Sequence, residues 1–133
     1  LFLNFTSYFF FLGYLPEIII SSPATRAVHT ALIFAKNLNC AYSDIRIEKK
    51  IYEASTKEML EIIRDLDDDF DSVMLFGHNP TITNFVNKRI DHRIDNVPTT
   101  GVACLKFDLE KWADVDNKAE LLFFDYPKRR NNL

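Results

Sequence analysis

An α/β fold with a largely parallel sheet is predicted by the alternation of short apolar strands with amphipathic helices along the chain. Two segments repeat one design. IIISSPATR (18–26) and VMLFGHNPT (73–81) each run from an apolar strand through a short polar turn and a proline into a helix. The strands are apolar at successive positions, as is typical of strands covered on both faces. We therefore expect a layered fold in which helices pack against the sheet.

The first regular elements lie between residues 17 and 38. Glu17–Ser21 is a β-branched run and is predicted to be a strand. Ser22 is a favourable N-cap and Pro23 a favourable first helical residue, so we predict a helix over 23–38. The apolar residues of this helix recur at helical spacing: Ala27, Ala31, Phe34 and Leu38.

The middle of the chain adds a strand and a helix. Residues 44–49 alternate apolar and charged side chains, which indicates a strand nearer the edge of the sheet. The stretch EASTKEMLEIIRDL (53–66) predicts a second helix, capped by Ser55 with Glu58 at the capping-box position. The residues of this helix that face the core are predicted to be Leu60, Ile63 and Leu66.

The remaining elements follow an acidic turn, DLDDDFDS (65–72). We predict that this turn is a solvated loop rather than a metal site, because nothing in the sequence indicates further ligands that converge on it. The rest is predicted as strands at 73–76, 102–109 and 119–126, a helix at 81–90, a polar loop at 91–101 and a loose polar tail at 127–133.

Length and charge restrict the class of protein. A chain of 133 residues suits one domain with a hydrophobic core, and 47% apolar and 26% charged residues are ordinary for a soluble globular protein. The net charge of −3 provides no general basic field for nucleic acid, so any anion recognition must be local. Cys40 and Cys104 fit no metal spacing, and we expect free core thiols in a reducing, cytoplasmic compartment.

The N-terminal stretch LFLNFTSYFFFLGYL (1–15) is uncharged and rich in aromatic residues. It is shorter than the about 20 apolar residues that span a membrane, and it lacks the basic region and the small-residue cleavage site of a signal peptide. We interpret it as the start of a fragment or as an altered N-terminus, with a membrane segment as the minority alternative.

The two repeated strand-to-helix turns carry the candidate functional residues. Such turns lie at the carboxyl ends of the strands, where ligands bind, and a helix N-terminus there offers free N–H groups and a partial positive charge. Arg26 falls in the first turn of one helix and His78 directly before the other, although cations are disfavoured there by a few tenths to about 1 kcal/mol. Alone, Arg26 is more often a surface residue and His78 a structural one. Their matched settings favour a phosphoryl group held between guanidinium and imidazole.

Several stretches resemble one known family: PEIIISSPATRAVHTA, IYEAS, GHNPTIT, and NVPTTGVACLKFD followed by LLFFDYP. They are similar to the SixA-type phosphohistidine phosphatases of the histidine phosphatase (phosphoglycerate mutase-like) superfamily, over about residues 13–128. The resemblance implies a three-layer α/β/α sandwich and phosphoryl transfer to an enzyme histidine followed by hydrolysis, with no metal or other cofactor. It assigns Arg26 to a phosphate-binding arginine. It assigns His78 to the second histidine of the pocket, which binds the phosphoryl oxygens.

The sequence departs from the family at the nucleophile. The family carries this residue in an Arg-His-Gly or Arg-His-Ala motif at the end of the first strand, and no Arg-His pair occurs here. The resemblance therefore implies an atypical segment at 1–12, a phosphatase-like domain at 13–128 that lacks the first strand, and a polar tail at 129–133. His29 and His92 are expected to be exposed rather than catalytic.

Three further residues are weaker candidates for the site. Glu53 could be a proton donor in the manner of the superfamily, although a surface carboxylate beside a helix is the better interpretation. Asn79 is expected to cap its helix. Asn79 and Thr100 are also weak candidates for contact with phosphate.

The function predicted for the intact relative is dephosphorylation of a phosphohistidine on a phosphotransfer or signalling protein, or of a small phosphate ester. Without the nucleophile this chain is expected to be inactive or very weak, because removal of a covalent nucleophile costs many orders of magnitude in rate. The alternative is a non-catalytic pseudoenzyme that binds phosphate or a phosphoprotein. A receiver-like signalling module fits less well, since it needs an acidic pocket. Neither nucleic acid nor a membrane is expected as a partner.

Overall fold

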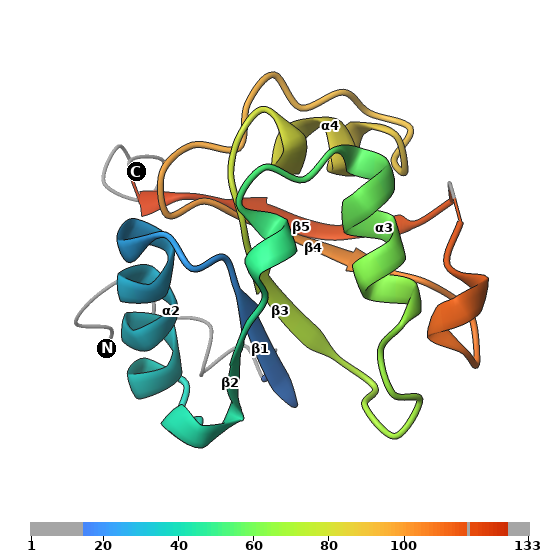
Figure 1. Cartoon of the computed structure of the whole chain (residues 1–133). Helices are drawn as coiled ribbons and strands as arrows, with labels where there is room; N and C mark the ends of the chain where they lie inside the picture. Colours follow the sequence, from blue (N-terminus) through green and yellow to red (C-terminus); the bar gives the residue numbers. More distant parts are fainter. Residues whose placement is uncertain (1–14, 117, 128–133) are drawn as a thin grey trace. The chain divides into compact units, whose positions relative to one another are not determined.

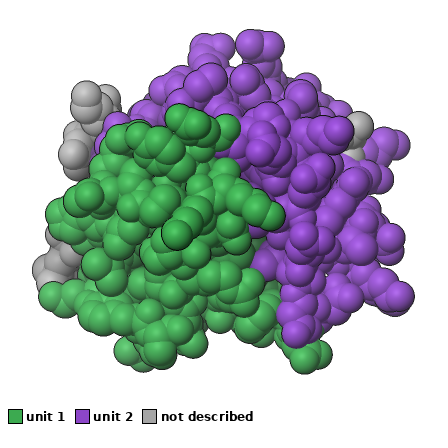
Figure 2. Space-filling view, in the orientation of Figure 1, with its two compact units in different colours: residues 1–53, 69–78 green, residues 54–68, 79–133 purple. Residues whose placement is uncertain are grey.

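The computed structural model describes residues 15–116 and 118–127, and these residues form two compact units. Unit 1 comprises residues 15–53 and Asp69–His78, whereas unit 2 comprises Ala54–Asp68 and the described residues from Asn79 onward (Figure 2). Each unit is therefore built from two separate segments of the chain. The atypical segment predicted at 1–12 and the tail predicted at 129–133 lie outside the described residues.

Unit 1 is built on a three-stranded parallel sheet, in which β1 (Ile18–Ser21) lies between β2 (Ile45–Ile47) and β3 (Val73–Phe76) (Figure 1). The register pairs Ser21 with Ile47 on one side and with Phe76 on the other. All three strands therefore end at the same edge of the sheet. The parallel strands confirm the predicted α/β class.

Helix α2 (Thr25–Asn37) follows β1 and covers one face of this sheet (Figure 1). Its buried residues Ala31 and Ala35 pack with Ile19 of β1, as do four half-buried residues of the same unit: Cys40, Ile45, Met74 and Phe76. The helical spacing of alanines seen in the sequence therefore forms the contact between helix and sheet.

The two ends of α2 differ in how well the sequence predicted them. At the C-terminal end Asn39 adopts a left-handed conformation (φ 57°), and its N–H donates to the Lys36 carbonyl while the Cys40 N–H donates to the Ala35 carbonyl. This is a Schellman motif. At the N-terminal end the prediction was wrong, because the helix begins at Thr25 with Ala24 at the N-cap position.

Strands β2 and β3 show the effect of their neighbours. Strand β2 is shorter than the predicted 44–49 because single 3₁₀ turns, Tyr42–Asp44 and Lys49–Ile51, flank it. Strand β3 matches the prediction residue for residue, but its four apolar side chains are half-buried, whereas those of β1 are buried throughout. Within the part of the chain that the structure describes, β3 pairs with one strand only.

Unit 2 contains α3 (Thr56–Arg64), α4 (Thr81–Asn87) and an antiparallel pair of strands, β4 (Val102–Lys106) and β5 (Glu120–Asp125). The predicted capping box of α3 is confirmed: the Ser55 hydroxyl accepts the Glu58 N–H at 3.1 Å, and the Glu58 carboxylate accepts the Ser55 N–H at 3.2 Å. Ile63 and Leu66 are buried as predicted. Leu60 is half-buried, and Met59 instead takes the core position.

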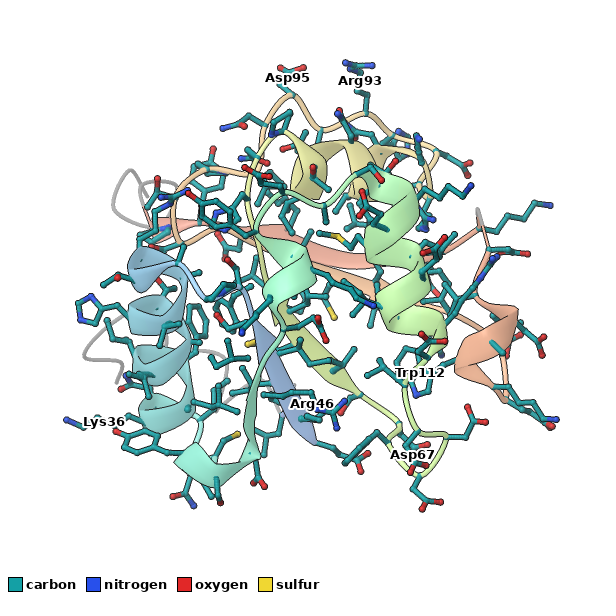
Figure 3. All side chains as sticks on the ribbon, viewed as in Figure 1. Lys36, Arg46, Asp67, Arg93, Asp95 and Trp112 are labelled. Atoms are coloured by element: carbon teal, nitrogen blue, oxygen red, sulfur yellow. The ribbon has the colours of Figure 1, made fainter. Side chains whose placement is uncertain are left out.

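Helix α4 packs against β4 and β5 through one apolar cluster, centred on Val86, Ile94 and Val97. It ends at Asn87 rather than at the predicted residue 90, because the Asn87 side chain accepts from the Ile94 N–H and donates to the Ile94 carbonyl, both within 2.8 Å. These bonds turn the chain back into the 91–101 loop. The side chains of Arg93 and Asp95 point outward from that loop (Figure 3).

The remaining sequence predictions concern surface and redox features. The aspartates at 67, 68, 69 and 71 are exposed, and Asp67 lies at the outside of its loop (Figure 3). Over residues 15–116 and 118–127, no three His, Cys, Asp or Glu side chains group as a metal site would require. Cys40 and Cys104 are both free and half-buried. None of the helices in the described ranges has the length and hydropathy that crossing a bilayer requires.

Candidate functional site

Ser22, the residue after β1, holds the turn on which the site of unit 1 is built. Its N–H donates to the Phe76 carbonyl at 2.9 Å, which ties the end of β1 to the end of β3. Its side chain is 0% exposed, and its hydroxyl oxygen accepts the Ala24 N–H at 3.2 Å. Ser22 therefore satisfies a backbone donor just before α2 from inside the turn, rather than from the predicted N-cap position.

His78 follows β3 and contacts this turn. Its Nε2 lies 2.7 Å from the Ser22 hydroxyl oxygen, and its Nδ1 lies 3.1 Å from Nη2 of Arg26. A guanidinium can only donate, so Nδ1 must accept, and the neutral imidazole carries its proton on Nε2 and donates it to Ser22. The structure thus brings together the two basic residues that the sequence singled out, and their contacts imply the Nε2-protonated tautomer of His78.

The charge state of His78 agrees with this hydrogen-bond pattern. Burial lowers the pKa of His78 below 6.5, and the positive charge of Arg26 lowers the pKa further. The neutral form therefore predominates at neutral pH. An anion placed beside both side chains would raise the pKa of His78, because its negative charge favours the imidazolium.

Helix α2 contributes further donors to the same region. Within the described ranges, the N–H groups of Thr25 and Arg26 form no hydrogen bond, and the first turn of α2 contains no acidic side chain. The Arg26 side chain is exposed on that turn. Free N–H groups, a guanidinium and an imidazole thus lie together in unit 1, a combination suited to binding an anion.

Tyr52 adds an aromatic ring that nothing in the sequence marked as functional. Its ring contacts the His78 imidazole edge to face, with the ring centroids 5.6 Å apart and an angle of 78° between the planes. Tyr52 follows the 3₁₀ turn after β2, and 51% of its surface is exposed. The only signal for it was its place in IYEAS, the stretch in which Glu53 was the candidate.

The weaker candidates occupy other settings. Glu53 is exposed, and no residue in the described part of the chain forms a hydrogen bond with its carboxylate. In unit 2 the Asn79 oxygen accepts the Thr83 N–H at 3.1 Å and the Thr83 hydroxyl at 2.7 Å, so Asn79 holds the first turn of α4. The Asn79 amide nitrogen donates to the Val97 carbonyl at 2.7 Å. All atoms of this amide that can bond are engaged, and a contact between Asn79 and phosphate stays a prediction.

Thr100 and the other histidines complete the set of predicted residues. Thr100 has a φ of 61° in a turn that the Gly101 N–H closes on the Pro98 carbonyl at 2.8 Å. A β-branched residue with positive φ is strained. A contact between Thr100 and phosphate stays a prediction. His29 and His92 are exposed, as predicted.

The fold is shared with solved structures assigned as SixA phosphatases. A protein from Agrobacterium tumefaciens assigned as phosphohistidine phosphatase SixA is 26% identical with a TM-score of 0.75, and the match covers 92% of this chain and 75% of that one. A protein histidine phosphatase SixA complexed with tungstate is 15% identical with a TM-score of 0.77, covering 94% and 78%. A protein from Nakamurella multipartitia with the same assignment as the first is 18% identical with a TM-score of 0.67, covering 92% and 79%.

The sequence comparisons add no nearer relative. No protein-family model matches the chain, and no curated protein matches it. The structural matches extend over more than nine-tenths of the chain, and they agree with the family that the sequence motifs resembled. This protein therefore has the fold of the SixA-type histidine phosphatases.

Proposed function

We propose that unit 1 provides the phosphate-binding part of a phosphohistidine phosphatase site, with Arg26 and His78 as the groups that hold the phosphoryl oxygens. The observation that carries this proposal is the 3.1 Å contact between Arg26 Nη2 and His78 Nδ1 at the carboxyl edge of the parallel sheet. These are the two residues that the family resemblance assigned to phosphoryl binding. The substrate is a protein that carries phosphohistidine, with small phosphate esters as poorer ligands.

The donors of the site suit a tetrahedral dianion. The Arg26 guanidinium can turn from His78 to a phosphoryl oxygen, and a protonated His78 can then donate through Nδ1 to a second oxygen. The free N–H groups of Thr25 and Arg26 can serve a third. One of the similar structures was solved with tungstate, which is also a tetrahedral oxyanion.

The chain offers no free imidazole nitrogen for attack on phosphorus at this site. Without ligand Nδ1 of His78 accepts from Arg26, and with a phosphoryl ligand Nδ1 carries the proton donated to a phosphoryl oxygen, whereas Nε2 carries the proton donated to Ser22. Transfer from phosphohistidine would break the P–N bond of the substrate and form a P–N bond to an unprotonated imidazole, which water later cleaves. We therefore propose that the 133-residue polypeptide binds phosphoryl groups and turns them over very slowly or not at all.

A second candidate is a non-catalytic phosphoprotein-binding module, which the lack of an Arg-His pair in the sequence favours. The two functions differ in one assay. Slow hydrolysis of an aryl phosphate that His78→Ala abolishes would indicate a residual phosphatase, whereas tungstate binding without any hydrolysis would indicate the binding module. For both functions the free thiols Cys40 and Cys104 fit a reducing compartment such as the cytoplasm.

The proposal is tested by calorimetric titration of the polypeptide with tungstate. Loss of charge-assisted hydrogen bonds in Arg26→Ala is expected to cost about 1.5–3 kcal/mol, or about ten- to a hundred-fold in affinity. Arg46→Ala is the matched control, because Arg46 is an exposed arginine on β2 of the same unit. Its affinity is expected to stay within about twofold of the wild type. Equal affinities of the two variants would show that tungstate does not bind at Arg26.

A further inference from the structure

Binding of a phosphoryl group does not by itself account for the exposed phenol ring of Tyr52 beside His78. An edge-to-face pair covers only part of each ring, and 51% of the Tyr52 surface is exposed. The face of an aromatic ring carries partial negative charge, so it gains nothing from a bare oxyanion. A planar group that carries the phosphoryl would, in contrast, pack well against it.

The neighbouring residues suggest where such a group would lie. Tyr52 follows the 3₁₀ turn Lys49–Ile51, and this turn follows Ile47, which pairs with Ser21 at the carboxyl end of β1. Ile47 is 47% exposed, so a second apolar side chain lies at the same edge of the sheet. Besides the residues proposed to bind the phosphoryl group, the carboxyl edge of this sheet thus carries exposed apolar surface on Tyr52 and Ile47.

We propose that Tyr52 is a specificity-determining residue, whose ring contacts the planar group bearing the phosphoryl and so favours imidazole- or phenyl-linked phosphoryl over alkyl-linked phosphoryl. This inference rests on the proposed function, because it places the phosphoryl at Arg26 and His78. A merely structural Tyr52, which only holds the His78 ring, predicts something different. It would affect every phosphoryl ligand equally, since all of them need the same imidazole.

Two ligands of equal charge distinguish these roles: phenyl phosphate and methyl phosphate. Their dissociation constants are measured by calorimetry for the wild type, Tyr52→Ala and Tyr52→Phe. Tyr42→Ala serves as the control, because Tyr42 is a tyrosine of the same unit that is 58% exposed. Thermal unfolding confirms that each variant is folded, which is expected for substitutions at exposed positions.

The wild type is expected to prefer phenyl phosphate. Tyr52→Ala is expected to reduce that preference by about two- to tenfold, which corresponds to the about 0.5–1.5 kcal/mol of an aromatic pair. Tyr52→Phe and Tyr42→Ala are expected to retain it. An equal loss of affinity for both ligands, or an unchanged preference in Tyr52→Ala, would overturn the inference and leave the proposed function intact. If the wild type binds neither ligand, the proposed function itself fails and the inference fails with it.

Discussion

Binding of a phosphoryl dianion at Arg26 and His78 is expected to take up a proton. Without ligand the guanidinium donates to Nδ1 of His78, whose pKa is lowered first by burial and then by the charge of Arg26. A proton on Nδ1 would point at the guanidinium, so the unliganded site favours neutral imidazole. The same Nδ1 must carry a proton in order to donate to a phosphoryl oxygen. The ligand therefore reverses the preference of His78.

The size of this reversal follows from Coulomb's law. Two unit charges about 4 Å apart interact by about 1 kcal/mol in water and by about 4 kcal/mol at the effective dielectric constant near a protein surface. Because His78 is half-buried, its interaction with a phosphoryl oxygen falls between these values. Such an energy shifts the protonation equilibrium by about fivefold to several hundredfold. Where free His78 is neutral and bound His78 is charged, the affinity falls about tenfold for each unit of rising pH.

Proton uptake is measured by titrating methyl phosphate into the polypeptide at pH 7.5 in two buffers with different ionisation enthalpies. The ligand is then almost fully dianionic, because the second pKa of a phosphate monoester is about 6. A measurable uptake of protons is expected for the wild type, approaching one proton per bound ligand at the upper end of this range. His29→Gln and His92→Gln should retain the uptake, since both side chains are exposed and lie outside the site. His78→Gln should lose it. If the wild type binds methyl phosphate without taking up a proton, the proposed protonation of His78 by the ligand is refuted.

Three further predictions concern stability. Because the pKa of His78 is lowered in the folded state, its contribution to stability is present above the unfolded pKa near 6.5 and is lost as the pH falls through the folded value. The free energy of urea unfolding should therefore fall more between pH 7 and pH 5 for the wild type than for His78→Gln. An equal fall in both proteins would contradict this role of His78. At the left-handed position of Asn39, Asn39→Ala is expected to lower the unfolding free energy by about 1 kcal/mol and Asn39→Gly to preserve or raise it. Equal urea midpoints for the two variants would argue against the Schellman motif. Arg89 is 4% exposed, its Nε has no partner in the described part of the chain, and burial followed by the charge of Arg64 lowers its pKa while Asp116 opposes them. Arg89→Met should then unfold within about 1 kcal/mol of the wild type or at higher urea, because it removes a buried cation and keeps an apolar stem. A loss above about 2 kcal/mol would instead show that the contacts of the guanidinium with the Phe85 ring and the Phe85 carbonyl are essential.

The sequence predicted the elements well where their signals are local. The capping box of α3 depends on residues three positions apart, and β3 is bounded by an acidic turn and Gly77, so both were found at the right residues. Helix α4 was predicted too long because its end is set by hydrogen bonds between Asn87 and Ile94, in the loop beyond it. The predicted start of α2 was wrong because the Ser22 hydroxyl forms a hydrogen bond with His78, which lies 56 residues further along the chain. A local pattern contains no information about such a partner.

In the candidate site, too, features with a local sequence signal were predicted and features that depend on distant partners were not. The proximity of Arg26 and His78 could be predicted because each follows a strand whose end carries its own turn signal, and parallel strands bring their ends to one edge. The direct hydrogen bond between them and the orientation of the imidazole were not predictable, because they depend on how far each side chain extends from the first turn of α2 and from the residue after β3. Tyr52 was missed because an exposed aromatic residue after a short turn has no sequence signature, and its significance comes only from its contact with His78.

Two contacts within unit 1 determine whether Arg26 and His78 can share a ligand. The register of β1 and β3 pairs Ser21 with Phe76, and the Ser22 N–H donates to the Phe76 carbonyl. The segments that follow β1 and β3 therefore leave the sheet at the same level. The Phe76 ring also packs against Phe34 of α2, with centroids 5.4 Å apart, and α2 is the helix that carries Arg26. A slip of one residue in this register would turn every β3 side chain to the opposite face and remove Phe76 from α2. The spacing between guanidinium and imidazole is therefore a property of the strand pairing and the helix packing together, which is why two residues separated by 52 positions lie 3.1 Å apart.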